Sequence, residues 1–381
     1  MRPARHPRVR VYRTLRSAHL ERAAAEAAQG RPVSLLHRFR RYDFDASLAA
    51  GTDVQQLGPW RTAAVLLVSR VERLEVNEPL MAEAAPSALL AALAARAGAR
   101  LRGARRPRVV AYAIANLAPP RGAGGRARIR AVLARWSGAR LLALTDRLAV
   151  GTPGALDLYQ ELLPRQLATC DHRLVPALPA PCSCPRPRPD EGAGAETTGA
   201  GVDGRARTVL FVGALERRKG AHLLLQAWPA VSAARPGSRL VLVGRGQLEA
   251  EAAHLASGDD VDLVVDPPRA RVHEALRGAS VLVLLSQRTR GWREQVGLPL
   301  VEGLAHGCAV VTTQETGLAG WLQEHGHRVL PAEPSVAEVA AALVAALDER
   351  RPASSVLDQL PGTDGRFEAD AWLEEQPSRP S

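Results

Sequence analysis

The sequence contains almost no lysine: forty-nine of its fifty basic residues are arginine, and Lys219 is the exception. A composition rich in alanine and arginine is typical of a GC-rich coding bias, so much of the arginine excess is no evidence for a polyanionic partner. Aromatic residues make up only 4% of the chain. Because the arginines are not regularly interleaved with aromatic residues and no recognition motif is present, we expect no nucleic-acid partner.

Cysteine is scarce as well. Cys170, Cys182, Cys184 and Cys308 are too few and too scattered for a disulfide framework. Cys182 and Cys184 flank a single serine, with no second cysteine pair and no histidine near them in the sequence. The segment 259–262 contains an Asp-x-Asp string, which we interpret as a turn before a strand and not as a metal site. The histidines show no ligand spacing; those considered are His37, His222, His254, His273, His306, His325 and His327. We therefore expect no metal site and no cofactor.

Long apolar runs are missing too, since no stretch of about 18 apolar residues could span a membrane. The first thirty residues are basic and lack the apolar core of a secretory signal. We expect a cytoplasmic protein, with peripheral contact to the inner face of a membrane left open.

Charge is divided unevenly along the 381 residues. Residues 1–180 hold 29 arginines against 13 acidic residues, whereas residues 181–381 hold 21 basic against 26 acidic residues. The basic first half favours an anionic partner such as a phosphorylated substrate or anionic lipid, and an arginine-studded, solvated surface is the alternative.

The length suits two domains, and composition indicates where they meet. Residues 181–207 are dense in proline, glycine and small polar residues, which predicts a linker. We therefore expect an N-terminal domain over 1–180 and a C-terminal domain over 208–365. A helix and tail over 366–381 could return to cap the first domain.

The second half alternates apolar runs with helical patterns. Strands are predicted at 208–215, 238–246, 261–266, 280–286 and 308–313, with helical stretches between them. Near-continuous apolar strands that alternate with helices predict a parallel sheet covered on both faces. The first half is less regular, with strands expected at 8–12, 32–39, 62–69, 108–115 and 147–152 and helices at 15–27, 86–102 and 126–145. The fold class is α/β, with two doubly wound, Rossmann-like domains that would face a cleft.

The segment "REQVGLPLVEGLAHG" (293–307) predicts an anion-binding helix terminus. Pro299 suits a first helical turn, and Gly307 suits a helix end. The N–H groups around Gly297 to Leu300 and the helix dipole would then bind a diphosphate. Glu294 would face what lies beyond the phosphates, and Glu302 could bind a ribose. An ordinary helix with a solvated Glu302 and a capping Glu294 is the alternative.

Lys219 follows the strand predicted from residue 208 and opens the next helix, again at the carboxyl end of a strand. A compact ammonium delivers a point charge that the planar fork of arginine does not. We interpret its retention in a chain that otherwise uses arginine as a requirement for charge at a diphosphate. Chance survival of one surface lysine is the alternative.

These residues resemble a known family. "FVGALERRKGAHLLLQAW", "RLVLVGRG" and "EQVGLPLVEGLAHGCAVVTTQETGLAGWL" are similar to the nucleotide-sugar domain of retaining GT-B glycosyltransferases of family 4 (group 1), over residues 208–350. The resemblance implies that Glu294 contacts the donor sugar, Glu302 the ribose and Lys219 the diphosphate. It also implies that Gly297 and Leu298 present N–H groups to the phosphates.

The chain departs from this family pattern at two places. The family usually has an arginine directly after the glycine of Gly213, where this chain has Ala214. The missing charge could come from Arg217 or Arg218. The first domain also lacks the glycine-rich loop that the family uses beside its first strand.

The acceptor side is expected in the first domain, where "ERLEVNEPLM" and "VVAYAIANLAPP" place Asn77, Glu78, Tyr112 and Asn116 at strand ends. These could instead be turn and core residues. The resemblance implies a metal-independent enzyme (EC 2.4) that transfers a sugar from a nucleoside-diphosphate sugar to an acceptor hydroxyl with retention. The acceptor could be a glycan, a lipid or a small molecule. The alternative is a catalytically inactive GT-B protein that binds nucleotide sugars or assists another transferase.

Overall fold

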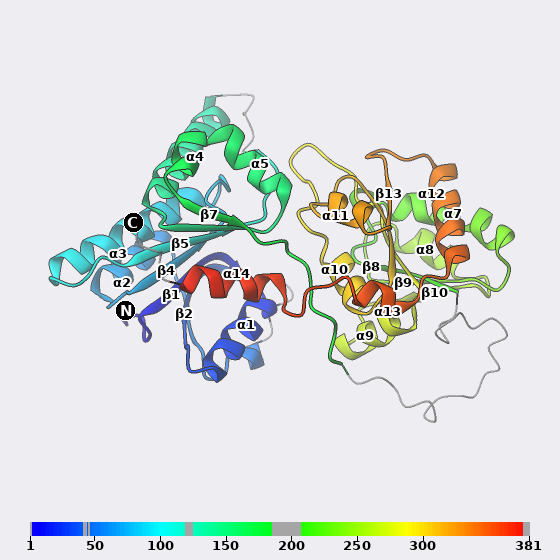
Figure 1. Ribbon diagram of the computed structural model, residues 1–381, viewed down its shortest axis with the longest axis horizontal. Coiled ribbons are helices and arrows are strands. Elements are labelled where there is room, and N and C mark those ends of the chain that lie inside the picture. The colour runs from blue at the N-terminus through cyan, green and yellow to red at the C-terminus, as the bar shows by residue number, and fades with distance from the viewer. Residues whose placement is uncertain (1, 41–43, 45, 119–124, 185–206, 376–381) are drawn as a thin grey trace. The chain divides into compact units, whose positions relative to one another are not determined.

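The computed structural model describes residues 2–40, 44, 46–118, 125–184 and 207–375. The chain divides into two compact units: an N-terminal unit of Met1–Val175 with Ala369–Ser381, and a C-terminal unit of Pro176–Glu368 (Figure 1). Of the predicted linker over 181–207, residues 185–206 lie outside the described part of the chain.

The N-terminal unit is built on a parallel sheet of seven strands in the order β3-β2-β1-β4-β5-β6-β7. The strands are β1 (Arg8–Leu15), β2 (Ser34–Arg40), β3 (Asp53–Gln56), β4 (Arg73–Asn77), β5 (Arg108–Ala113), β6 (Arg147–Val150) and β7 (Asp171–Leu174). The helices are α1 (Ser17–Ala28), η1 (Ala46–Ala49), α2 (Pro59–Val68), α3 (Ala85–Leu101), α4 (Gly125–Leu144), α5 (Pro153–Leu162), α6 (Pro164–Ala168) and, at the end of the chain, α14 (Gly365–Glu374).

The C-terminal unit repeats the plan with six parallel strands in the order β10-β9-β8-β11-β12-β13. They are β8 (Thr208–Val212), β9 (Arg239–Val243), β10 (Val261–Val264), β11 (Val281–Leu284), β12 (Ala309–Thr313) and β13 (Arg328–Leu330). The helices are η2 (Arg217–Lys219), α7 (Ala221–Ala234), α8 (Glu249–Leu255), α9 (Arg269–Gly278), α10 (Leu298–Ala305), α11 (Ala319–Glu324), α12 (Val336–Glu349) and α13 (Ala353–Leu357).

Both sheets reverse their strand order, at β1/β4 and at β8/β11 respectively. Val9 pairs with Leu74 at the first reversal, and Val209 pairs with Val281 at the second. In open parallel sheets, ligands bind outside the carboxyl ends of the strands at such a switch point. The predicted fold of two doubly wound α/β units is therefore confirmed, and each unit has one position where a ligand site is expected.

One sequence prediction is wrong: residues 62–69 were expected to form a strand, but residues 62–68 lie in α2 and Ser69 is the C-cap of that helix. The helix begins with Gly58 as its N-cap and Pro59 in the first turn. Its buried residues Thr62, Ala63, Val65 and Leu66 share one helical face, while Val68 is exposed. An apolar run of this length cannot be assigned to strand or helix by periodicity alone.

Helix α14 packs on the N-terminal unit although it ends the chain. Ala369, Trp372 and Leu373 form an apolar cluster with buried residues of that unit, Val110, Tyr112, Ala149 and Val175. At its carboxyl end, Arg108 donates to the carbonyl oxygens of Glu374 (3.0 Å) and Glu375 (2.6 Å). These charges satisfy the last carbonyl groups of the helix and complement its dipole.

A network of buried charges fixes α14 and α1 to this sheet. Arg10 of β1 donates to Glu75 of β4 at 2.8 Å and pairs with Glu26 of α1. Arg22 of α1 donates to Glu75 at 2.9 Å and pairs with Asp370 of α14. All five side chains are at least nine-tenths buried. Because buried charges are tolerated only when paired, each member holds the others in place.

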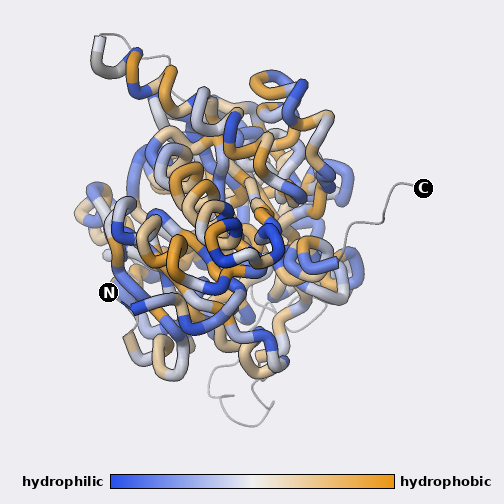
Figure 2. Tube along the Cα trace, turned by 90° about the vertical axis from the view of Figure 1, so that its left-hand side faces the viewer, coloured by the Kyte–Doolittle hydropathy of each residue, from blue (hydrophilic) through white to orange (hydrophobic). Residues whose placement is uncertain are grey.

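Apolar and polar residues alternate along the helices, as the colours of Figure 2 show. Within the described ranges, no helix combines the length and the apolar character that crossing a bilayer requires.

Candidate active site

The switch point of the C-terminal unit holds Lys219. Strand β8 ends at Val212, and the chain reaches the one-turn helix η2, whose last residue is Lys219. Gly220 then takes a left-handed conformation (φ 73°), and a Cβ there would lie 2.0 Å from the carbonyl oxygen of Leu285, just beyond β11. Glycine therefore lets η2 and the start of α7 lie directly against the end of β11.

Lys219 forms an ion pair with Glu294, in the loop between β11 and α10. The two side chains are 15% and 11% exposed, so the pair is largely withdrawn from water. The hydroxyl of Ser286 donates to the same carboxylate at 2.9 Å. Lysine and glutamate, predicted separately from two distant motifs, thus meet in the structure, and Ser286 completes the group.

Trp292 forms one side of this group. Its ring centroid lies 5.0 Å from Nζ of Lys219 and 4.6 Å from the guanidinium carbon of Arg218. Arg218 also pairs with Glu216 at 2.6 Å. Both cations thus lie within cation–π distance of the same ring, which favours their positive charges at this place.

The loop that carries Glu294 is clamped by the turn after β12. Arg293 pairs with Glu315 at 2.8 Å, and the hydroxyl of Thr316 donates to the carbonyl oxygen of Val296 at 2.6 Å. The N–H of Gly317 donates to the carbonyl oxygen of Gln295 at 2.9 Å. These bonds fix the loop by its backbone, so that the Glu294 carboxylate is positioned by its surroundings.

Helix α10 begins where this loop ends. Gly297 is its N-cap, in a left-handed conformation (φ 85°), and Pro299 lies in the first turn. The expectation of free N–H groups as far as Leu300 needs correction, because the Leu300 N–H donates to the carbonyl oxygen of Gly297 at 2.9 Å and proline has no N–H. Gly297 and Leu298 carry the remaining N–H groups of this turn, where the helix dipole attracts an anion.

Two further residues predicted to bind the donor, Glu302 and Gly213, make their contacts with residues other than Lys219 and Glu294. Glu302, in the second turn of α10, pairs with Arg269 of α9 at 2.6 Å and is 22% exposed. Gly213, after β8, donates its N–H to the carbonyl oxygen of Val243 at 2.9 Å and so continues the sheet. Neither contact tests the donor role predicted for these residues.

The four predicted acceptor residues lie at the ends of β4 and β5 in the N-terminal unit, where Asn77 pairs with Tyr112 in register. The Glu78 carboxylate accepts the N–H groups of Ile114 (2.8 Å) and Ala115 (3.1 Å) and so fixes the turn after β5. Tyr112 is packed in the cluster below α14, and Asn116 is buried. Glu78 and Tyr112 therefore have structural contacts that the sequence did not reveal.

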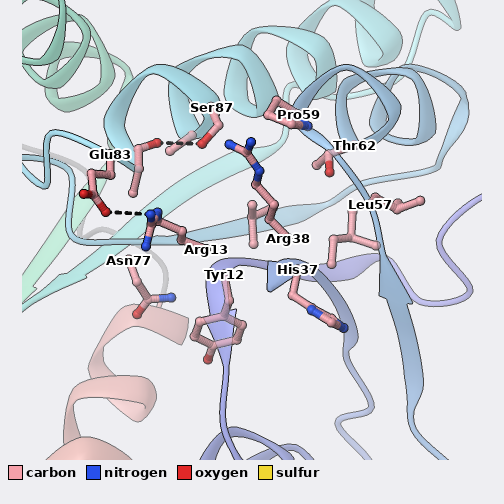
Figure 3. A pocket seen from close by; sticks show the side chains of 14 residues that line it. Tyr12, Arg13, His37, Arg38, Leu57, Pro59, Thr62, Asn77, Glu83 and Ser87 are labelled. Carbon is pink, nitrogen blue, oxygen red and sulfur yellow. Dashed lines mark hydrogen bonds and ion pairs between the residues drawn. The ribbon is translucent and has the colours of Figure 1, made fainter. Parts of the chain in front are cut away.

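Asn77 also lines a pocket at the β1/β4 switch point (Figure 3). Arg13, at the end of β1, pairs there with Glu83 at 2.6 Å, and Arg38 of β2 also lines the pocket. His37 lines it as well, and burial lowers its pKa. Arg13 and Arg38 belong to no motif, and their places at the ends of predicted strands are the signal in the sequence that could have indicated them.

Cys182 and Cys184 have no histidine near them in the sequence, but the fold brings two histidines beside them, where no metal site was expected. Together with His273 of α9 and His306, which follows α10, they offer four ligand atoms within 4.8 Å of one another. The histidines lie about ninety and one hundred and twenty residues further along the chain, so sequence spacing could not reveal the cluster.

Residues 198–357 match the family model described as "Glycosyl transferases group 1". A "Phosphatidyl-myo-inositol mannosyltransferase" of Mycobacterium tuberculosis is 36% identical over 157 residues, which cover 38% of this chain and 39% of the relative. The chain spans only 27–39% of the length of the curated relatives that it matches.

Solved structures resemble the whole chain. WaaG, "a glycosyltransferase involved in lipopolysaccharide biosynthesis", has a TM-score of 0.59 at 16% identity, covering 96% of this chain and all of that one. A structure described as "Trehalose-6-phosphate from E. coli bound with UDP-2-fluoro glucose" has a TM-score of 0.62 at 13% identity, covering 97% and 100%. The fold is thus that of GT-B glycosyltransferases, and the segment over residues 198–357 is similar to their group 1.

Proposed function

We propose that the protein is a retaining glycosyltransferase that moves a sugar from a nucleoside-diphosphate sugar to an acceptor hydroxyl. The observation that carries the proposal is the Lys219–Glu294 pair beside the N-terminus of α10. The pair lies at a topological switch point, within the segment that matches group 1 glycosyltransferases.

Lys219 and the N–H groups of Gly297 and Leu298 bind the diphosphate in this proposal. Glu294 contacts the donor sugar and Glu302 the ribose, as the family resemblance implies. Arg218 supplies the charge that Ala214 lacks, because it shares the Trp292 ring with Lys219. Binding of the diphosphate transfers Lys219 from Glu294 to the phosphate oxygens, which frees that carboxylate to accept hydrogen bonds from sugar hydroxyl groups.

The transfer breaks the bond between the sugar C1 and the diphosphate oxygen and forms a bond from C1 to the acceptor oxygen. The proton of the acceptor hydroxyl passes to the departing diphosphate, so that no protein nucleophile is required. Negative charge that develops on the diphosphate is stabilised by Lys219 and the helix terminus, without a metal at this position. Asn77, Glu78, Tyr112 and Asn116 remain the proposed acceptor-side residues, Asn77 through the pocket of Figure 3.

The acceptor is proposed to be presented at an anionic membrane surface on the cytoplasmic side. The first half of helix α4 buries small residues such as Ala131 and Ala134 and leaves Ile129, Val132, Leu133 and Trp136 exposed. Arginines flank this face, and α4 contains no acidic residue. An apolar stripe bordered by arginines suits the interface of an anionic bilayer, and the mycobacterial relative is named for a phosphatidyl lipid.

Vesicle sedimentation tests the membrane contact. We expect binding to vesicles that contain phosphatidylglycerol, weaker binding in salt, and several-fold weaker binding after the double substitution Ile129→Ser, Trp136→Ser. Trp60→Ser is the matched control, since Trp60 is exposed in α2 of the same unit. Equal binding of all three proteins would contradict the contact.

Incubation of the purified protein with UDP-, GDP- and dTDP-sugars tests the transferase. We expect hydrolysis or transfer from at least one donor, and loss of turnover by about 100-fold or more in Glu294→Gln. Glu349→Gln is the control, because it alters an exposed ion pair of the same unit. Donor binding without turnover across the panel would favour the inactive binder or partner subunit.

A further inference from the structure

We propose that Cys182, Cys184, His273 and His306 form a structural zinc site in the C-terminal unit. The two cysteines lie just before the residues at 185–206, His273 lies in α9, and His306 follows the last residue of α10 (Figure 1). Two thiolates and two imidazoles are a ligand set that selects zinc among the common divalent cations. The proposal does not depend on the transferase activity.

The distances between the ligand atoms fit a tetrahedral ion. Zn–S bonds of about 2.3 Å and Zn–N bonds of about 2.05 Å place tetrahedral ligands roughly 3.6 Å apart for S···N and roughly 3.3 Å apart for N···N. Sγ of Cys182 lies 3.9 Å from Nδ1 of His273, and Sγ of Cys184 lies 3.4 Å from Nε2 of His306. The two ring nitrogens are 3.0 Å apart. The other pairs of ligand atoms lie within 4.8 Å of one another, so shifts of up to about 1 Å would complete the site.

The surroundings of His306 prepare it to bind a cation. Its Nδ1–H donates to the carbonyl oxygen of Glu302 at 2.7 Å, so Nε2 presents its lone pair to the cluster. Without metal, the 3.0 Å separation is a hydrogen bond from His273 to His306; with metal, that proton moves to the other ring nitrogen of His273.

The thiols have partners that stabilise their deprotonated form. Arg277, one helical turn beyond His273, donates to Sγ of Cys184 at 3.3 Å. The N–H of Cys184 donates to Sγ of Cys182 at 3.4 Å. Binding of Zn²⁺ would release the two thiol protons to solvent, and the positive charge of the ion would balance the two thiolates.

Four protein ligands fill a tetrahedron and leave no position for a substrate, so the site would be structural. It would join the chain before residue 185 to α9 and α10, where the N–H of Cys182 already donates to the carbonyl oxygen of Ala305 at 2.8 Å. Glu302 lies between this cluster and the start of α10, and it is paired with Arg269 of α9. The metal would therefore fix the end of α10 opposite its anion-binding N-terminus.

Metal analysis of the full chain, expressed with added zinc and purified in reductant, tests the site. We expect about one zinc per chain, and less than a tenth of that in the double variant Cys182→Ser, Cys184→Ser. Cys170→Ser is the control, because it removes a buried cysteine of the other unit. Wild-type protein without zinc, or a double variant that retains it, would overturn the proposal.

Cobalt titration of chelator-stripped wild-type protein keeps the test decisive if the double variant fails to fold. One equivalent of Co²⁺ should give the d–d absorption of a tetrahedral ion together with thiolate-to-cobalt charge transfer, and His306→Asn should change both. An octahedral spectrum, or a wild-type protein in which Cys182 and Cys184 are recovered as a disulfide, would contradict the zinc site.

Discussion

The two units have the same sheet plan and use charge in opposite ways. In the N-terminal unit, arginines and carboxylates are buried on a face of the sheet, where Arg10, Arg22, Glu75 and Asp370 satisfy one another below α14. In the C-terminal unit, Lys219 and Glu294 pair at the carboxyl edge of the sheet and keep part of their surface in water. A ligand can reach the pair at the sheet edge and replace one of its partners, whereas no ligand can reach the buried network, which loses an interaction only by mutation or unfolding.

This contrast gives part of the arginine excess in the first half a structural explanation. Arg8, Arg31 and Arg73 all pair with Glu374 of α14, and Arg108 and Arg147 donate to its last carbonyl groups. From the sequence, these arginines were expected to face an external anionic partner or solvent. In the structure they bind α14 of the same chain.

Breaking the buried network should have the largest effect. Arg22→Ala leaves Glu75 and Asp370 with one partner fewer in a dry environment, and we expect a loss of about 3–5 kcal/mol in the free energy of unfolding of the N-terminal unit. Hydrogen exchange of its strands measures this. Arg70→Ala, in an exposed pair with Glu72, should cost under about 0.5 kcal/mol. A similar small cost for Arg22→Ala would refute the locking role of the network.

A backbone change that displaces Lys219 from Glu294 should lower the free energy of unfolding by less than loss of the buried network does. Gly220→Ala places a Cβ against Leu285 in a left-handed conformation, and we expect about 2–3 kcal/mol of destabilisation in the C-terminal unit together with weaker donor binding. Gly237→Ala is the matched control: it has a similar φ of 80° but open space around it, so it should cost about 1 kcal/mol and leave donor binding unchanged. Equal effects of the two variants would show that close approach at Gly220 is unimportant.

Acid should weaken the C-terminal unit through His327. Burial lowers the pKa of His327 to about 3, and its Nδ1 accepts the N–H of Val310 at 3.1 Å. The unfolded chain takes up this proton below pH of about 6.5 while the folded unit does not, so stability falls with pH from there to about 3. Between pH 6.5 and 5 we expect a loss of about 2 kcal/mol from this residue.

Denaturant titrations at the two pH values measure this loss. His327→Gln should reduce the change between them, whereas His254→Gln, on an exposed helix surface, should leave it as in the wild type. An undiminished pH dependence in His327→Gln would contradict the account.

Those parts of the fold were predictable that depend on local signals in the sequence, namely the period of apolar residues and the positions of glycines. The strand and helix pattern from Thr208 to Thr313 agrees closely with the structure, because each buried strand is a short apolar run that ends near a glycine or a polar turn. The run at 62–69 failed for the complementary reason, since a short apolar segment carries no period that separates strand from helix.

The site was predictable only in part. Lys219 and Glu294 stood out as unusual residues in motifs, and the structure brings them together. Ser286, Trp292 and the cysteine–histidine cluster were missed, because their meaning depends on contacts between segments far apart in sequence. Spacing rules detect ligands on one hairpin or helix, whereas here the two cysteines share one segment and the two histidines come from two other segments.

Calorimetric titration of the protein with UDP, GDP and dTDP tests the central claim most directly. For the diphosphate that the wild type binds, Lys219→Ala should weaken binding about 10- to 100-fold, as expected for loss of a charged hydrogen bond of about 1.5–3 kcal/mol. The double variant Lys219→Ala, Glu294→Gln also removes the negative charge that faced Lys219, and its binding should remain weak. Unchanged affinity in Lys219→Ala, or full recovery in the double variant, would contradict a diphosphate contact by Lys219.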